Sequence, residues 1–315
     1  MNYYDMCGIK IRTKLDFSRL LYRCGTNSYD FEIVRDEDFF TEELIIHSKI
    51  LYRKFVFGES IPYEEFFQID AKSYLLRWLR KYSFFIDCEK RLLIINSKFD
   101  GEVSAVLFSK ILSFLLYYKG NSQLHGSAVK YQGKTICFIG ESGSGKSTIA
   151  SLCVMNGGKF ITDEIIVFHP EDRMIKSGIP SVRIDPSLPF AKMAKNCFEE
   201  VDKIRVDVSN GLHYTETSVA DCFFFLEVNN NKELSFNRLK GSEKMLHLLS
   251  NVYGKHFIKN VFSTFYTKNI SVFTHFSKEI PMFKVYRHSK TKPEDFFELI
   301  HSLMSNLDKG GETFG

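Results

Sequence analysis

Several common functional signatures are missing from this 315-residue sequence. Its seven cysteines are spread singly, with no C-x-x-C pair, which argues against a zinc site and a disulfide framework and favours reduced thiols. Lysine and arginine are scattered, and the formal net charge is only +4, so no basic stripe marks a nucleic-acid surface. We therefore expect a cytoplasmic protein with no nucleic-acid partner.

Signals for export and for membrane insertion are also missing. The first eight residues lack the basic-then-apolar order of a signal peptide. The most apolar stretch, residues 103–118, is only about four turns long and contains Lys110. The sequence therefore predicts a buried helix that is too short to span a bilayer, and no membrane partner.

What is present is an ordinary globular composition rich in aromatic rings. Hydrophobic residues make up 44% of the chain and charged residues 25%, both typical values. Phenylalanine alone occurs 31 times, so the cores are expected to be built largely from rings. The length allows one large domain or two ordinary ones.

The sequence contains a complete phosphate-binding loop of the form G-x-x-x-x-G-K-[ST]. Glycines at its turns let the backbone point successive N–H groups inward around a phosphate. Lys146 can reach the β- and γ-phosphates, and Ser147 can offer its hydroxyl to Mg²⁺. The predicted nucleotide-binding residues are Gly140, Glu141, Ser142, Gly143, Ser144, Gly145, Lys146, Ser147 and Thr148.

The residues around this loop fit a strand–loop–helix unit. Residues 135–139 form a short apolar run of β-formers, as a buried parallel strand does. Residues 147–156 place Ile149 and Cys153 at helical spacing and are followed by the glycine pair 157–158, which suits a C-cap. The sequence therefore predicts binding of a nucleoside triphosphate, with ATP and Mg²⁺ as the expected cofactors. We find no N-K-x-D motif of the kind that reads guanine.

Acidic side chains follow the next predicted strand. Asp163 and Glu164 come directly after residues 159–162, one helix and one strand beyond Lys146. In a right-handed β–α–β unit the two strands are parallel and end at the same edge of the sheet, so these carboxylates are expected near the γ-phosphate. A carboxylate there can hold Mg²⁺ or accept the proton of an attacking hydroxyl, although a solvated acidic turn is the alternative.

His125 opens the predicted strand 124–131, which precedes the strand of the phosphate-binding loop. If that strand neighbours the loop strand, the imidazole lies at the nucleotide edge and can orient or tune Asp163. A purely structural histidine is the alternative for any lone position. The predicted catalytic residues are thus Asp163, His125 and Lys146, and the predicted metal ligands are Ser147, Asp163 and Glu164.

The pattern divides the chain into three parts. Residues 1–120 alternate as strands do and form a smaller β-rich α+β region, whose strands 83–88 and 92–96 look like a hairpin. Residues 121–307 form an α/β P-loop domain with a mixed sheet, and residues 308–315 a flexible tail. Further predicted elements are a turn at 170–173, strands 165–168, 222–228 and 282–286, and helices 242–253 and 292–307; residues 191–210 are left unassigned.

Three runs together resemble the kinase domain of HPr kinase/phosphorylase. They are L-H-G-S-A-V at 124–129, G-E-S-G-S-G-K-S-T at 140–148, and F-I-T-D-E at 160–164. The likeness is greater to stand-alone relatives, which include tailoring kinases of lasso-peptide and other ribosomal-peptide gene clusters. It is clearest over residues 123–170 and looser through 180–184 and 203–206. The amino-terminal region does not resemble the regulatory domain of true HPr kinases.

This resemblance implies a role for each matching residue. Lys146 would bind the phosphates and Ser147 the Mg²⁺, while Asp163 would be the base, with His125 beside it. The family carries an Asp-Asp pair where this chain has Asp163 followed by Glu164, which leaves the role of Glu164 open. The resemblance also suggests cations that stabilise the transferring phosphoryl group, although each is an ordinary surface cation on the alternative reading. These candidates are Arg183, Lys203 and Arg205.

The leading prediction is an ATP-dependent kinase that phosphorylates a hydroxyl. The acidic strand end close to the loop favours a kinase, because an alcohol acceptor needs a base near the γ-phosphate. The resemblance implies a serine of a peptide or small protein as the acceptor, in particular a ribosomal (lasso) precursor peptide. The alternatives are a small-molecule kinase, an HPr(Ser) kinase and a non-catalytic nucleotide-binding regulator. The sequence leaves a homo-oligomer open.

Overall fold

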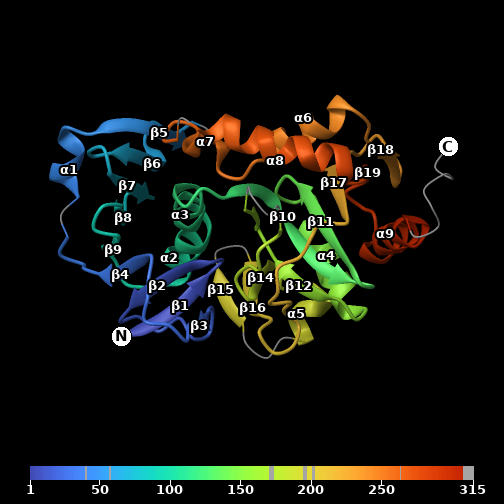
Figure 1. Cartoon of the computed structure of the whole chain (residues 1–315), viewed down its shortest axis with the longest axis horizontal. Coiled ribbons are helices and arrows are strands. Elements are labelled where there is room, and N and C mark those ends of the chain that lie inside the picture. Colours follow the sequence, from blue (N-terminus) through green and yellow to red (C-terminus); the bar gives the residue numbers. More distant parts are fainter. Residues whose placement is uncertain are drawn as a thin grey trace. The chain divides into compact units, whose positions relative to one another are not determined.

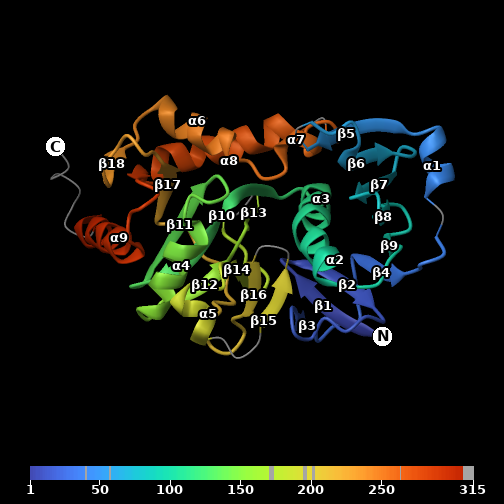
Figure 2. The same ribbon diagram turned by 180° about the vertical axis from the view of Figure 1, so that it is seen from behind.

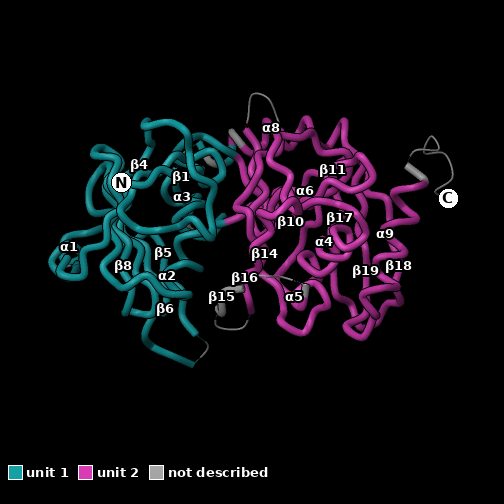
Figure 3. The backbone as a smooth tube through the Cα atoms, turned by 90° about the horizontal axis from the view of Figure 1, so that it is seen from below, with its two compact units in different colours: residues 1–121, 199–201, 254–266 teal, residues 122–198, 202–253, 267–315 magenta. Residues whose placement is uncertain are grey.

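The computed structural model describes residues 1–39, 41–56, 58–169, 174–193, 197–200, 203–262 and 264–307 (Figure 1). The chain is of the mixed α/β class, as the sequence predicted. By their internal contacts its residues form two compact units (Figure 3). Unit 1 comprises residues 1–121, 199–201 and 254–266, and unit 2 comprises 122–198, 202–253 and 267–315. The predicted turn at 170–173 and the predicted tail at 308–315 lie outside the described residues.

Unit 1 is built on a nine-stranded mixed sheet. Its strands are β1 (Asn2–Met6), β2 (Ile9–Thr13), β3 (Tyr22–Arg23), β4 (Phe31–Arg35), β5 (Lys49–Phe55), β6 (Pro62–Gln68), β7 (Ser73–Trp78), β8 (Tyr82–Asp87) and β9 (Leu92–Ile95). They lie in the order β3-β1-β2-β4-β9-β8-β7-β6-β5. The predicted hairpin is β8 and β9, which pair antiparallel, whereas β4 runs parallel to β2 and to β9. A short helix, α1 (Glu42–Ile46), precedes β5.

The predicted apolar helix is the central helix of unit 1. It begins as α2 (Gly101–Val106), passes through a π-helical turn (Leu107–Ile111), and ends as α3 (Leu112–Tyr118). At 18 residues it is long and apolar enough to cross a bilayer, so the expectation that it is too short was wrong. However, 72% of it is buried inside the protein, because its rings pack among those of the unit. Phe114, for example, contacts the rings of Phe66 and Tyr74.

A segment from the second half of the chain completes this unit. Residues 254–266 include α7 (Lys255–Ile258), which contacts β5. The ring of Phe262 lies 5.6 Å from that of Phe114, and the side-chain amide of Asn260 donates a hydrogen bond of 2.7 Å to the carbonyl of Leu51. The sequence-based division placed this segment in the P-loop domain, whereas its contacts place it in unit 1.

Unit 2 contains a seven-stranded mixed sheet. Its strands are β10 (Ser122–Tyr131), β11 (Lys134–Gly140), β12 (Lys159–Thr162), β13 (Ile165–Phe168), β17 (Cys222–Val228), β18 (Ser235–Arg238) and β19 (Met282–Arg287). The order is β12-β10-β11-β17-β19-β18, and β13 also pairs with β10. β10 runs antiparallel to both β11 and β12, so those two strands point the same way with β10 between them. β17 is parallel to β11 and to β19.

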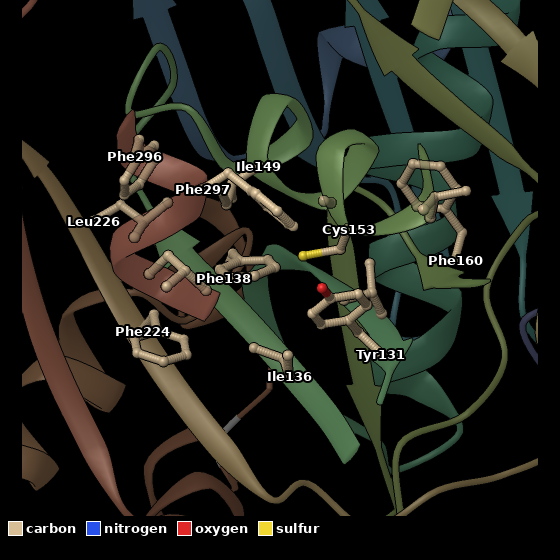
Figure 4. Close-up of a cluster of buried hydrophobic side chains, with 14 of the residues drawn as sticks. Tyr131, Ile136, Phe138, Ile149, Cys153, Phe160, Phe224, Leu226, Phe296 and Phe297 are labelled. Carbon is tan, nitrogen blue, oxygen red and sulfur yellow. The ribbon is translucent and has the colours of Figure 1, made fainter. Parts of the chain in front are cut away.

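Helices cover both faces of this sheet (Figures 1 and 2). On one face α4 (Lys146–Met155) and α9 (Pro293–Leu307) pack with the strands around Phe138 and Phe224, and the rings interleave with aliphatic side chains (Figure 4). On the other face α8 (Phe265–Glu279) places Phe276 5.6 Å from the ring of Phe223. Adjacent residues of β17 thus face opposite ways, as the period of a strand requires.

Unit 2 also contains smaller elements, and two predicted helices are confirmed. The predicted helix 242–253 is α6 (Ser242–Ser250), and the predicted helix 292–307 is α9. Before the unassigned residues 191–210 lies β14 (Ser181–Ile184), α5 (Pro189–Met193) spans their start, and within them lie β15 (Cys197–Glu200) and β16 (Lys203–Asp207). These strands form a separate sheet in the order β14-β16-β15.

Candidate active site

The phosphate-binding loop joins β11 to α4, as the sequence predicted. Its three glycines have positive φ angles, +155° at Gly140, +82° at Gly143 and +101° at Gly145. Residues other than glycine rarely adopt such angles, so glycine suits all three positions. At Gly140 a Cβ atom would also lie 2.5 Å from the carbonyl oxygen of Leu226 on the neighbouring strand. Gly140 therefore supports the shape of the loop rather than lining the pocket.

Lys146 is buried at the start of α4 and folds back onto its own loop. Its ammonium group donates hydrogen bonds to the carbonyl oxygens of Gly140, at 2.8 Å, and Glu141, at 2.7 Å. Burial lowers the pKa of Lys146 to about 8, and the nearby carboxylate of Asp163 acts in the opposite direction. The ammonium must leave these carbonyls to reach a bound phosphate.

Asp163 follows β12 and is held by three hydrogen bonds from three different elements. Its Oδ1 accepts from the hydroxyl of Ser127 on β10, at 2.5 Å, and from the hydroxyl of Ser147 on α4, at 3.0 Å. Its Oδ2 accepts from the backbone N–H of Arg183 on β14, at 2.9 Å. The carboxylate is therefore fixed beside the hydroxyl that the sequence assigned to the metal.

Glu164 has a backbone conformation that residues other than glycine seldom adopt. Its φ is +71°, and its Oε1 accepts a hydrogen bond of 3.1 Å from the hydroxyl of Tyr253. Burial raises the pKa of Glu164, and the charges of Arg205 and Arg183 only partly oppose this effect. Local backbone strain of this kind is often found at functional sites.

His125 lies at the same edge of the sheet, on β10. Its ring centroid is 5.5 Å from that of Tyr253, with the two planes at 79°. Burial, and then the charges of Lys146 and Lys203, lower the pKa of His125 to about 3, so the imidazole is neutral at physiological pH. Within the described residues no hydrogen bond joins His125 to Asp163, and the donors that orient Asp163 are the three given above.

The three candidate cations come from β14 and β16. Arg183 and Lys203 line the pocket, whereas Arg205 is buried behind it and donates a hydrogen bond of 3.3 Å to the hydroxyl of Ser181. Arg183 and Arg205 are directly opposite each other in the antiparallel pair. This small sheet therefore supplies positive charge to the lining of the pocket.

These groups surround one pocket of about 420 Å³, which is within the range of small-ligand sites. Glu141 and Ser144, although predicted to bind the nucleotide, do not line it and contribute backbone carbonyls to other contacts. The predicted residues that line it are His125, Ser142, Gly143, Gly145, Lys146, Ser147, Thr148, Asp163 and Glu164.

The donor atoms present suit Mg²⁺. The hydroxyl of Ser147 and the carboxylate of Asp163 are hard oxygen ligands 3.0 Å apart, and Mg²⁺ usually takes one or two carboxylates and completes its shell with phosphate oxygens and water. Among the described residues no group of three or more histidine, cysteine or acidic side chains could hold a metal ion by itself. The residues therefore fit a magnesium ion that arrives with a nucleotide.

The sequence did not predict Ser127, Tyr253 and Arg287 as residues of the site, nor Ile184, Asp185 and Leu188, which also line the pocket. Ser127 lies two positions after His125, on the same face of β10, and this spacing could have revealed it. Tyr253 and Arg287 lie far along the chain without a local motif. Arg287 donates from Nε to the carbonyl oxygen of Ser144, at 2.8 Å, and from Nη2 to that of Gly143, at 2.9 Å.

Comparison with known proteins gives only a distant likeness. No family model matches the sequence, and no curated protein matches it. Among solved structures, the chain is similar to the Hpr(Ser) kinase/phosphatase from Coxiella burnetii, with 10% sequence identity and a TM-score of 0.32. The match covers 59% of this chain and 93% of that chain. A likeness at this TM-score carries no argument about function, which rests on the geometry of the site.

Proposed function

We propose that this chain is an ATP-dependent phosphotransferase that moves the γ-phosphoryl group to a hydroxyl. The observation that carries the proposal is the hydrogen bond between Ser147 of the phosphate-binding loop and Asp163 at the end of β12. It brings a phosphate-binding loop, a magnesium-type ligand pair and an acidic strand end into one pocket, which is the arrangement that phosphoryl transfer needs.

In this proposal the chain acts mainly by positioning the phosphates and by offsetting the charge of the transferring group. The N–H groups of the loop and the ammonium of Lys146 hold the phosphates, and Arg183 and Lys203 offset the charge that develops on the transferring group. Mg²⁺, held by Ser147 and Asp163, would neutralise charge on the β- and γ-phosphates. The proton of the acceptor hydroxyl passes to a carboxylate as the oxygen attacks phosphorus and ADP leaves.

Of the carboxylates that line the pocket, those of Asp163 and Glu164 are the candidates for that proton, and Asp185 is the third. The sequence favours Asp163 as the base. The hydrogen bonds in the structure favour separate roles for the two, because both oxygens of Asp163 already accept hydrogen bonds and one of the donors is the hydroxyl of Ser147, the predicted metal ligand. Glu164 has a raised pKa and lines the same pocket, which suits a proton acceptor. We therefore propose Asp163 as the metal-side carboxylate and Glu164 as the alternative base.

The acceptor class rests on the sequence resemblance alone. It favours a serine of a peptide or small protein, in particular a ribosomal (lasso) precursor peptide. A small hydroxyl compound, HPr itself, or nucleotide binding without transfer are the other candidates. An acceptor that is a peptide must be able to enter the pocket beside Asp163 in an extended form, whereas a small molecule need only fill it.

The test is intact-mass spectrometry of candidate acceptors after incubation with Mg·ATP. The acceptors are HPr and any short peptide encoded beside this gene, and the enzymes are the wild type and Lys146→Ala. A gain of about 80 Da, the mass of one phosphoryl group, that disappears with Lys146→Ala supports the kinase. Bound nucleotide with no modified acceptor would favour a small-molecule kinase or a nucleotide-binding regulator.

A further inference from the structure

Arg287, the last residue of β19, reaches across to the phosphate-binding loop from the carboxyl-terminal part of the chain. Its guanidinium donates to two consecutive carbonyl groups, those of Gly143 and Ser144, at 2.9 and 2.8 Å. It also packs against the loop, because a Cβ atom added to Gly145 would lie 3.2 Å from Nε of Arg287 and 3.5 Å from the ring of Phe296 on α9. The loop is therefore contacted by β19 and α9, and Arg287 also lines the pocket.

Fixing a carbonyl also fixes the N–H on the other side of the same peptide plane. In a planar trans peptide the C=O of one residue and the N–H of the next point in opposite directions. The bond to the carbonyl of Ser144 therefore turns the N–H of Gly145 away from Arg287. The bond to the carbonyl of Gly143 likewise orients the preceding peptide, between Gly143 and Ser144. The N–H of that peptide, on Ser144, donates to the carbonyl of Glu141 at 3.2 Å.

We propose that Arg287 is a positioning residue that holds the loop in its phosphate-binding conformation; the proposal rests on the nucleotide site proposed above. Lys146 and Arg287 donate to different carbonyls of the loop. Lys146 holds those of Gly140 and Glu141 and must release them to meet a phosphate. The bonds of Arg287 to Gly143 and Ser144 do not use Lys146, so they keep the loop in shape when the lysine moves.

The chemistry of arginine suits this role better than that of lysine. The guanidinium is planar, carries five donors in a fixed fork and stays charged at all physiological pH values, so it can bind two neighbouring carbonyls at once. A lysine at the same place would keep the charge but present a single nitrogen. The substitution Arg287→Lys therefore separates the effect of the fork from the effect of the charge.

The experiment measures binding of Mg·ATP to the full chain by calorimetry. We expect Arg287→Lys to weaken binding about tenfold and Arg287→Ala by more than that, because charge-assisted hydrogen bonds to the loop are lost. The matched control is Lys240→Gln, an exposed cation of the same unit outside the pocket, which should bind like the wild type. Guanidinium ion at millimolar concentration should restore binding by Arg287→Ala, whereas sodium at the same concentration should not.

Two results would overturn the proposal while leaving the nucleotide site intact. One is binding by both Arg287 variants within twofold of the wild type. The other is normal binding by Arg287→Lys with weak binding by Arg287→Ala, since the positive charge alone would then suffice. Failure of the wild type to bind Mg·ATP would instead overturn the nucleotide site, and the role of Arg287 with it. Lys146→Ala distinguishes these cases, because it should abolish binding wherever the nucleotide site exists.

Discussion

At the scale of single residues, the buried amine of Lys146 would make the proposed nucleotide binding depend on pH. Its pKa is lowered to about 8 in the free protein, and a bound phosphate would raise it again by stabilising the charged form. Binding therefore requires proton uptake above pH 8, where the free lysine is increasingly neutral. We expect the Kd for Mg·ATP to be nearly constant from pH 7 to 8 and to rise above it by up to about tenfold per pH unit.

The control for this prediction is Lys146→Arg, because an arginine remains charged throughout the range. Its Kd, although higher, should not change between pH 8 and 9.5. Calorimetric titrations at four or five pH values would measure both proteins. A wild-type Kd that stays flat to pH 9.5 would show that the lysine does not titrate near 8 or does not bind the phosphates.

The two adjacent carboxylates give a second prediction at this scale. If Glu164 accepts the proton, it must be ionised, so kcat/KM falls as the pH drops through the raised pKa of this group. Glu164→Gln should then remove most of the activity and leave the Kd for Mg·ATP within about tenfold of the wild-type value. Asp163→Asn should then weaken the binding of Mg²⁺ with the nucleotide.

The opposite pattern would assign the base to Asp163, as the sequence resemblance does. In that case Asp163→Asn keeps the Kd for Mg·ATP within about tenfold of the wild-type value but no longer transfers the phosphoryl group. The fall of kcat/KM at low pH is then still seen in Glu164→Gln. His125 should produce no limb near pH 6.5 in either case, because burial lowers its pKa to about 3 and it stays neutral.

At the scale of elements, β10 lies between the strand of the phosphate-binding loop and the strand of Asp163, and it packs too closely for a side chain at Gly126. A Cβ atom there would lie 2.6 Å from the carbonyl oxygen of Phe138 and 2.7 Å from Cδ1 of Ile166. We expect Gly126→Ala to destabilise the protein by about 1–3 kcal/mol and to weaken nucleotide binding, since the neighbouring His125 and Ser127 must shift with the strand.

Thermal unfolding and Mg·ATP binding would both be measured for this variant. The matched substitution is Gly25→Ala, where a Cβ atom would meet nothing within 4 Å, and it should leave the unfolding midpoint unchanged. Equal midpoints for the two variants would mean that β10 accommodates the added methyl group.

The phosphate-binding unit could be predicted because its information is local. The loop motif, the apolar run before it and the helical spacing after it lie within about thirty residues, and they correspond to β11, α4 and β12 within one residue or so. The position of Asp163 followed from the handedness of a β–α–β connection. The position of β10 between β11 and β12 could not be predicted in this way, because strand order depends on packing rather than on local pattern.

The rest of the site comes from contacts between distant parts of the chain. Arg287 approaches the loop because β17 and β19 lie beside β11. Tyr253 approaches Glu164 because residues 251–253 lie against β10. No spacing in the sequence marks either residue as part of a site. The sheet of β14, β15 and β16 was also not predicted, since its strands are short and polar side chains interrupt their alternation.

At the scale of the whole molecule, unit 1 depends on a segment encoded far from the rest of it. Phe262 packs its ring against Phe114 and Tyr117 of the central helix. We expect Phe262→Ala to lower the stability of unit 1 by about 1–3 kcal/mol, because a half-buried ring is removed from an aromatic cluster. Hydrogen exchange of peptides covering residues 107–117 should show faster exchange, while exchange of α4 should change little.

Leu246→Ala provides the comparison, since this side chain on α6 is 63% exposed and its removal should affect neither region. Unchanged protection of residues 107–117 in Phe262→Ala would show that the segment 254–266 rests on unit 1 without stabilising it.

The discontinuity of unit 1 also has a consequence for the order in which the protein matures on the ribosome. Residues 1–121 emerge first, but residues 254–266, which complete their packing, are translated roughly 130 residues later. At typical elongation rates of about 5–20 residues per second this delay is on the order of 7–26 s. During that interval β5 and the ring of Phe114 lack the partners that α7 and Phe262 will provide, so we expect unit 1 to complete its packing only after residue 266 has been translated.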